Sequence, residues 1–238
     1  MTAVSLRSFY EKPEVPSNSG PDRARRQARM LQEVLRDTGL PALVVDIGCG
    51  DGTGTALAAR ANPGHRFVGL DWSAHALRRA RSRGLTLVRA DMERAGLPIA
   101  SGSADVVIMS DVIEHLVDPD SALDEALRVL KPAGTLLLST PNLAAWYNRG
   151  LLALGVQPVF TEVSLRGVFG RPGSQVVGHL RLFTGRALVG LLAARGFGAI
   201  RLSGACYHDV PVPLRPLDRA FSAWPTASSI LLARARKT

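Results

Sequence analysis

Short apolar runs and segments with helical spacing alternate along most of the chain. Five of the runs are apolar at nearly every position, which is typical of strands whose two faces are both covered. These runs are residues 42–47, 66–70, 85–90, 104–110 and 134–140. The segments between them place small and apolar residues at helical intervals. The pattern therefore predicts an α/β fold with a doubly wound, mostly parallel sheet.

Two later runs complete a predicted sheet of seven strands. Residues 199–205 follow a predicted helix, and residues 228–235 form the last apolar run. We expect this last strand to pair antiparallel at the edge of the sheet. In such sheets ligands bind beyond the carboxyl ends of the strands, so the residues that follow each strand are the candidates for function.

Polar residues at the starts of the helical segments predict where the helices begin. Ser73 and Asp120 stand at the starts of two of them, and each side chain can accept a hydrogen bond from a backbone N–H of the first turn. Thr184 has the same place before a helix that we expect to stop at Gly196.

The pattern also divides the chain into parts. Residues 1–39 are expected to form an N-terminal helical segment, in which Phe9 and Tyr10 could close over a ligand. Residues 40–238 are expected to form one domain, a size that can bury a sizeable core. Within this domain, residues 143–178 end in a stretch with little periodicity. We therefore expect an insertion or lid over the ligand edge.

The charge balance is strongly basic, with a formal net charge of +9 at pH 7 over 238 residues. Arginine accounts for 26 of the 29 basic residues, and these are scattered along the chain. The densest groups, residues 22–29 and 78–83, are interpreted as exposed helix faces. Because no concentrated basic stripe is present, we favour a small-molecule partner over nucleic acid. The oligomeric state is left open.

Two cysteines, Cys49 and Cys206, provide neither a disulfide framework nor a pair with metal-ligand spacing. No apolar run approaches the roughly 18 residues of a membrane span. The first residues also lack the apolar core of a signal peptide. A cytoplasmic location is therefore expected.

The stretch "VVDIGCGDGTG" at residues 44–54 leaves a predicted strand and opens a predicted helix. It matches neither the dinucleotide fingerprint, because threonine stands at 53 and 55, nor a P-loop. Glycines still let the backbone approach a ligand closely. The acids Asp46 and Asp51 would repel phosphate, and they suit a ligand with positive charge such as S-adenosylmethionine.

The next two strands also end in acids. Asp71 follows Gly50 by 21 residues, and a carboxylate there can accept hydrogen bonds from both hydroxyls of a ribose. Asp91 ends the third strand, where it can accept a hydrogen bond from an adenine amine while Met92 lies along the ring.

These motifs, together with "SADVVIMSDVIEHLVDP" and "ALRVLKPAGTLLLSTPN", resemble those of the class I S-adenosylmethionine-dependent methyltransferases. The resemblance spans about residues 40–202 apart from the insertion. It implies a Rossmann-like fold, S-adenosylmethionine as cofactor and methyl transfer, which we interpret as transfer to an oxygen of a small molecule. Two alternatives are a metal-dependent RNA 2′-O-methyltransferase and a regulator that binds the cofactor without turnover. The residues assigned to the cofactor are Asp46, Gly48, Cys49, Gly50, Asp71, Trp72, Asp91, Met92 and Ser110.

The stretch "MSDVIEHLVDP" at residues 109–119 places three polar residues where the resemblance puts the methyl acceptor. In a first interpretation Asp111 packs beside the cofactor while Glu114 and His115 cap a turn. In a second, His115 is a general base that takes the acceptor's proton, with Glu114 as its catalytic neighbour. We favour a catalytic role for these two residues without a metal.

In a third interpretation the same stretch binds a divalent cation. Some metal-dependent methyltransferases carry E-x-x-E-H at this strand end, and here Asp111 replaces the first glutamate. His179 follows 64 residues after His115 and could supply a further ligand. The set of Asp111, Glu114, His115 and His179 would suit Mn²⁺, Fe²⁺, Co²⁺ or Zn²⁺ better than Mg²⁺. This metal site is the alternative, not the expectation.

Overall fold

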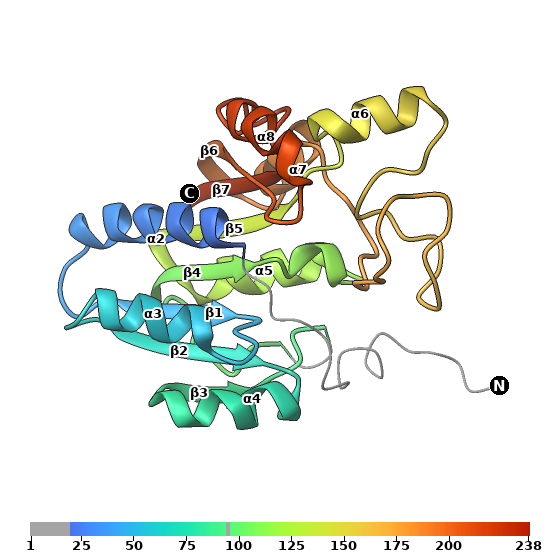
Figure 1. Cartoon of the computed structure of the whole chain (residues 1–238). Helices are drawn as coiled ribbons and strands as arrows, with labels where there is room; N and C mark the ends of the chain where they lie inside the picture. The colour runs from blue at the N-terminus through green and yellow to red at the C-terminus, as the bar shows by residue number, and fades with distance from the viewer. Residues whose placement is uncertain (1–19, 94–95) are drawn as a thin grey trace.

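The computed structural model describes residues 20–93 and 96–238, which are organised around one seven-stranded sheet (Figure 1). Phe9 and Tyr10 lie outside the described residues. The strand order is β3-β2-β1-β4-β5-β7-β6, and β1 to β5 pair in parallel. This confirms the predicted class. The strands are β1 (Leu43–Ile47), β2 (Arg66–Asp71), β3 (Thr86–Arg89), β4 (Ala104–Ser110), β5 (Leu130–Pro141), β6 (Phe197–Ala205) and β7 (Ile230–Lys237).

The antiparallel strand lies one place in from the edge. β7 pairs antiparallel with both β5 and β6, so β6 occupies the edge. The burial of the two strands explains this order. Ile230–Ala233 are all buried, whereas β6 alternates between buried, half-buried and exposed residues along much of its length. The more apolar strand thus takes the interior position, where both of its backbone edges are paired.

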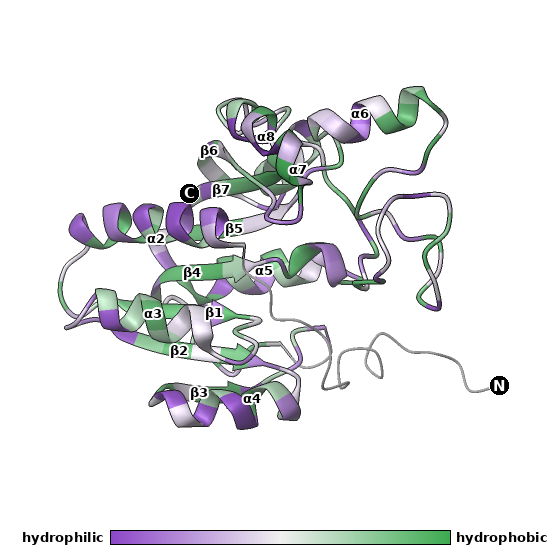
Figure 2. Ribbon diagram, viewed as in Figure 1, coloured by the Kyte–Doolittle hydropathy of each residue, from purple (hydrophilic) through white to green (hydrophobic). Residues whose placement is uncertain are grey.

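Helices cover both faces of the sheet. α2 and α3 pack on one face, where Leu31, Val34 and Leu35 of α2 meet strand residues such as Phe67 and Val106. α5 and α7 contribute to the larger core on the other face. Figure 2 shows the central strands β1 and β4 as largely hydrophobic between these layers. The helices are α2 (Pro21–Arg36), α3 (Thr53–Ala61), α4 (Ala74–Ala80), α5 (Pro119–Val129), α6 (Trp146–Ala153), α7 (Gly185–Ala194) and α8 (Arg215–Phe221).

The predicted helix starts agree with the structure at two of three positions. Ser73 accepts a hydrogen bond from the Ala76 N–H and Thr184 accepts one from the Ala187 N–H, each at 3.2 Å. The prediction for Asp120 is wrong, because Asp118 caps α5. Proline at the first helical position has a suitable φ and no N–H to satisfy, so the helix already begins at Pro119.

The chain after β5 leaves the sheet before it returns. α6 is followed by residues 154–182, which form neither helix nor strand. In Figure 1 this segment extends beyond the carboxyl ends of β4 and β5. Within the described ranges, no helix combines the length and apolarity that crossing a membrane requires.

Candidate functional site

The glycine loop between β1 and α3 touches the end of β4. Gly48 has φ +74°, and a Cβ built on it would lie 2.4 Å from Val112 Cγ2. Gly50 also has a positive φ, of 56°. Only glycine fits the first position without displacing Val112. The loop predicted for the cofactor is therefore directly beside the stretch predicted for the acceptor.

Asp46 carries a buried negative charge at the start of this loop. Its Oδ2 accepts a hydrogen bond of 2.6 Å from the Thr55 hydroxyl. Burial raises the pKa of this carboxyl to about 6, although Thr55 and the positive charge of Arg23 oppose the shift. A carboxylate that has lost its hydration favours a nearby cation, and the ammonium group of S-adenosylmethionine fits this requirement.

Asp51 does not share this role. Its carboxylate faces Arg79 at 3.5 Å and Arg83 at 3.2 Å, and the Arg83 Nε donates a hydrogen bond to its carbonyl oxygen. The expectation that Asp51 suits a cationic ligand is therefore not supported, because Arg79 in α4 and Arg83 just after it already compensate its charge.

Asp71 joins the end of β2 to the glycine loop. Its two carboxylate oxygens accept 2.8 Å hydrogen bonds from the backbone N–H groups of Gly50 and Ser73. An ionised carboxylate offers about four lone-pair positions. These two bonds hold the glycine loop beside Asp71, and its role as an acceptor for ribose hydroxyls stays a prediction.

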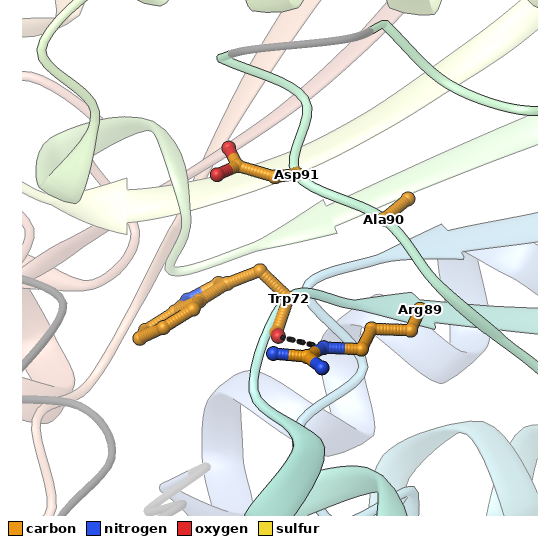
Figure 3. Close-up of a pocket in the computed structure, with 4 residues that line it drawn as sticks. All are labelled: Trp72, Arg89, Ala90 and Asp91. Atoms are coloured by element: carbon orange, nitrogen blue, oxygen red, sulfur yellow. Dashed lines mark hydrogen bonds between the residues drawn. The ribbon is translucent and has the colours of Figure 1, made fainter.

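A pocket of about 490 Å³ is lined by Trp72, which directly follows Asp71, and by Arg89, Ala90 and Asp91 at the end of β3 (Figure 3). The Arg89 Nε donates a 3.0 Å hydrogen bond to the Trp72 carbonyl, which joins two residues of the lining. In Figure 3 the Trp72 ring and the Asp91 carboxylate extend to the same side of it. Met92 is half-buried against the main core. The pocket offers an aromatic face and an acceptor oxygen, which suit an adenine.

The other two residues assigned to the cofactor have protein contacts. Cys49 fills the space above Gly69, where an added Cβ would lie 2.9 Å from its Sγ. Burial raises the pKa of this thiol, which makes it a packing residue rather than a nucleophile. The Ser110 hydroxyl accepts a 2.6 Å hydrogen bond from Gln27 Nε2.

Gln27 and its neighbour Arg23 are site residues that sequence reasoning missed. Residues 22–29 were expected to be exposed, but the Arg23 side chain is only 5% exposed. Its Nε lies 3.0 Å from Asp111 Oδ2, and its Nη1 donates hydrogen bonds to Ser139 and Gln27. A signal was present, because Arg23, Gln27 and Leu31 follow each other at intervals of four residues on one helix face.

Asp111 is held away from the other candidate ligands. It has a φ of +53°, and its Oδ1 accepts a 2.8 Å hydrogen bond from Ser139 while its Oδ2 pairs with Arg23. Both oxygens are therefore engaged on the side of α2 and β5. Asp111 lies close enough for its charge to act on Glu114 and His115, but it does not belong to the group of ligand atoms that converge there.

Those three residues do converge. One ligand atom from each of Glu114, His115 and His179 lies within 4.8 Å of the other two, and the imidazole rings are 4.8 Å apart. The turn at Ile113–His115 supplies the first two, and the segment after the insertion supplies the third. We call these three side chains the EHH cluster. The two histidines, far apart in sequence, meet as the metal interpretation requires.

Burial controls the protonation of the EHH cluster. Glu114 is fully buried, and burial together with the charge of Asp111 raises its pKa well above the usual range. Burial lowers the pKa of His115, and burial with the neighbouring His115 lowers that of His179 to about 3. Both imidazoles are therefore neutral at pH 7.

Comparisons with known proteins identify a methyltransferase domain in the chain. Residues 45–138 match the family model of a methyltransferase domain. The chain is 38% identical over 123 residues to a trans-aconitate 2-methyltransferase from Azoarcus sp. strain BH72, covering 51% of this chain and 47% of that protein. It is 41% identical over 105 residues to a malonyl-[acyl-carrier protein] O-methyltransferase from Herminiimonas arsenicoxydans, covering 42% and 39%. The chain thus spans less than half the length of these two relatives.

A solved structure extends the likeness to the whole fold. The chain superimposes on a methyltransferase from Thermotoga maritima, described as S-adenosylmethionine-dependent and a possible histamine N-methyltransferase, with a TM-score of 0.61. The match covers 90% of this chain and 91% of that chain at 19% identity. At this identity the likeness concerns the fold alone.

Proposed function

The chain belongs to the class I S-adenosylmethionine-dependent methyltransferases, and from this membership we propose that it transfers a methyl group to an oxygen atom of a small molecule. The observation that carries the proposal is the contact between Val112 and Gly48. It sets the loop that would hold the cofactor next to the EHH cluster, where the acceptor hydroxyl would lie.

The cofactor subsites support the first half of the proposal. Asp46 would bind the ammonium group, Asp71 the ribose, and the pocket at Trp72 and Asp91 the adenine. Each subsite offers acceptor oxygens or an aromatic face. This chemistry fits a cofactor with a positive charge and no phosphate.

The chemistry left to the chain is orientation and proton removal. S-adenosylmethionine supplies an activated methyl group when bound, so the residues have mainly to align the acceptor and take up its proton. The His115 Nδ1 donates to the Gly178 carbonyl at 3.1 Å, so Nε2 is the nitrogen that carries the lone pair of the neutral ring. Glu114 lies beside this ring, and a proton or a cation bound there would favour the ionised form of its buried carboxyl group.

The insertion at residues 143–178 is the part that we propose to select the acceptor. Phe160 packs between His179 and Tyr207, with ring centroids 5.7 and 4.8 Å away. This row of rings forms an aromatic wall next to the EHH cluster. By contrast, Trp146 at the start of α6 stacks on Phe221 of α8 and donates a hydrogen bond to Asp218 of the same helix. Its role is therefore to pack α6 against α8. An acceptor with an aromatic or apolar body fits such a wall.

The proposal is tested by identifying the methylated product. The protein is incubated with S-adenosylmethionine carrying a deuterated methyl group and a small-metabolite extract, and new labelled compounds are sought by mass spectrometry. An Asp71→Ala variant run in parallel identifies products that depend on the cofactor subsite. A labelled methyl ether or ester is the expected result.

Other outcomes would overturn the proposal. Cofactor binding by calorimetry without any labelled product, from metabolites or from RNA, would indicate a regulator that binds the cofactor. Label at the terminal ribose of added RNA, with none in metabolites, would indicate an RNA 2′-O-methyltransferase. Labelled amines would place the reaction on nitrogen instead of oxygen.

A further inference from the structure

We propose that Glu114, His115 and His179 form a three-ligand site for a divalent transition-metal ion of the Zn²⁺, Mn²⁺ or Co²⁺ class. Besides the convergence of these side chains, three observations carry this inference: a buried oxygen without a partner among the described residues, the orientation of the two imidazole rings, and a clamp that holds the histidines in place. The binding of the ion does not depend on the proposed function, but its role toward the acceptor hydroxyl rests on it.

The first observation concerns the carboxylate. Glu114 has no exposed surface, and its Oε2 accepts a 3.0 Å hydrogen bond from the Thr140 hydroxyl. Within residues 20–93 and 96–238, nothing hydrogen-bonds its Oε1. A buried acceptor without a partner costs about 1–3 kcal/mol, so native proteins rarely leave one without a reason. A bound cation would satisfy this oxygen.

The second observation concerns the ring orientation of both histidines. The Nδ1 of His115 lies 3.1 Å from the Gly178 carbonyl, and the Nδ1 of His179 lies 3.1 Å from the Phe160 carbonyl. A carbonyl oxygen can only accept, so each ring carries its proton on Nδ1 and its lone pair on Nε2. Metal-binding histidines are oriented by such bonds from the opposite nitrogen.

The third observation is a clamp in the insertion. The Glu162 carboxylate accepts hydrogen bonds from three successive backbone N–H groups, those of Val177, Gly178 and His179, at 2.6 to 3.0 Å. It also pairs with Arg171 at 3.2 Å, and both of these side chains are at most 6% exposed. The clamp fixes the carbonyl that orients His115 and the backbone that carries His179. Glu162 is therefore a positioning residue of the site.

The ligand set determines which ion fits. Asp111 is engaged by Arg23 and Ser139, so the protein offers one carboxylate and two imidazoles instead of the four-residue set. Two nitrogens and one oxygen suit Zn²⁺, Mn²⁺ or Co²⁺, whereas Mg²⁺ prefers oxygen ligands throughout. With bonds of about 2.0–2.2 Å, the three atoms would draw together by about 1 Å on binding.

Three protein ligands leave coordination positions open. In metalloenzymes such positions hold water or substrate, and the ion lowers the pKa of the oxygen that binds there. An acceptor hydroxyl at this position would release its proton to solvent more easily, which is the step that methyl transfer to oxygen requires.

The test measures metal binding directly, without cofactor or acceptor. The full chain without a polyhistidine tag is stripped with a chelator and titrated with Co²⁺, and binding is followed by calorimetry and by the visible absorption of the bound ion. We expect one ion per chain. His179→Ala and Glu114→Gln should weaken binding by at least about 100-fold, and Glu162→Gln by about 10–100-fold.

His75→Ala is the matched control, because this histidine lies on α4 outside the EHH cluster. It should bind Co²⁺ as the wild type does. Since buried variants can unfold, each is checked by thermal melting. The melting temperature should rise with Co²⁺ in the wild type and not in His179→Ala.

The inference is overturned if the stripped wild type binds no Co²⁺, Zn²⁺ or Mn²⁺, or if His179→Ala binds as tightly. Loss of the proposed activity with metal binding intact would refute the function and not the site.

Discussion

Arg23 Nε and Asp111 Oδ2 lie 3.0 Å apart, joining the first described helix to the end of the fourth strand. The pair adjoins the cofactor loop, because Asp111 directly precedes Val112, whose side chain meets Gly48. Arg23 also binds Ser139 at the end of β5. The Arg23 guanidinium thus links the ends of the neighbouring strands β4 and β5. It also binds Asp111 in its conformation with a positive φ.

Replacing Arg23 should therefore destabilise the domain. Arg23→Ala would leave Asp111 without its cation and Ser139 without a donor. Breaking a buried pair typically costs 3–5 kcal/mol, but the Asp111 side chain is 30% exposed, so we expect a loss of about 2 kcal/mol in the free energy of unfolding. Urea denaturation measures it. Arg25→Ala, at a side chain 71% exposed on the same helix, should change the value by less than about 0.5 kcal/mol; equal effects would refute a special role for Arg23.

Asp71 should contribute directly to cofactor affinity. Asp71→Ala would remove an acceptor for two ribose hydroxyls and also release the Gly50 N–H that positions the loop. We expect binding of S-adenosylmethionine to weaken by about 1–3 kcal/mol. Isothermal titration calorimetry measures the change, and the product S-adenosylhomocysteine should show it equally. Asp124→Ala, an exposed acid on α5, is the control. Unchanged affinity in Asp71→Ala would contradict the ribose assignment.

Local signals explain why much of the cofactor site could be predicted from sequence. The glycines at 48 and 50, Asp71 and Asp91 follow strands that are apolar throughout, and parallel strands bring their carboxyl ends to one edge. The position of each of these residues at that edge follows from the strand that it ends. The fold class follows from the same alternation. The alternation did not predict that β7 lies between β5 and β6, because the order of strands depends on which surfaces pack together.

The convergence of the EHH cluster could not be predicted in the same way. The segment that carries His179 is held beside His115 by contacts that are distant in sequence, from the Glu162 carboxylate to the His179 N–H and from the Glu114 carbonyl to the Leu180 N–H. Nothing in the periodicity of residues 156–178 signals this clamp. Likewise, Arg23 appears in a basic stretch that reads as solvent-exposed, and its burial depends on Asp111, 88 residues later in the sequence.

Asp46 should make stability depend on pH. Its folded pKa of about 6 lies above the unfolded value of 3.8, so between these values the folded state binds more protons. The contribution of this group therefore falls as pH rises from about 4 to 6, by about 3 kcal/mol in the free energy of unfolding. The Asp46→Asn variant has no carboxyl group that titrates at this position. Its stability relative to the wild type should rise over this window and stay constant above it, as urea denaturation at several pH values would measure.

The same residue should link cofactor binding to pH. A bound ammonium group favours ionised Asp46, so the affinity of the wild type for S-adenosylmethionine should increase as pH rises through about 6 and then level off. Asp46→Asn should bind more weakly at pH 7, with a flatter profile between pH 5 and 7. Calorimetry at each pH gives both curves. Parallel curves for the two proteins would show that Asp46 does not face the cationic part of the ligand.

The last prediction distinguishes the two roles of His115 in catalysis. If the EHH cluster holds an ion, a chelator should abolish methyl transfer and added Mn²⁺ or Co²⁺ should restore it. His179→Ala should then lose activity as His115→Ala does, since each removes one of three ligands. If His115 acts only as a base, the chelator should have no effect, while His115→Ala lowers kcat by about 10²–10⁴-fold and spares cofactor affinity.

A third outcome separates both roles from simple turn packing. The backbone carbonyl of Glu114 accepts hydrogen bonds from the N–H groups of Leu180 and Arg181, and these bonds persist whatever side chain stands at 115. His115→Ala should thus keep the turn folded, which the cofactor affinity and the melting temperature would verify. Full transfer activity of that folded variant in the presence of chelator would exclude both the base and the metal ligand. Because the neutral ring already has its Nδ1 bound to Gly178, we expect the loss of activity instead.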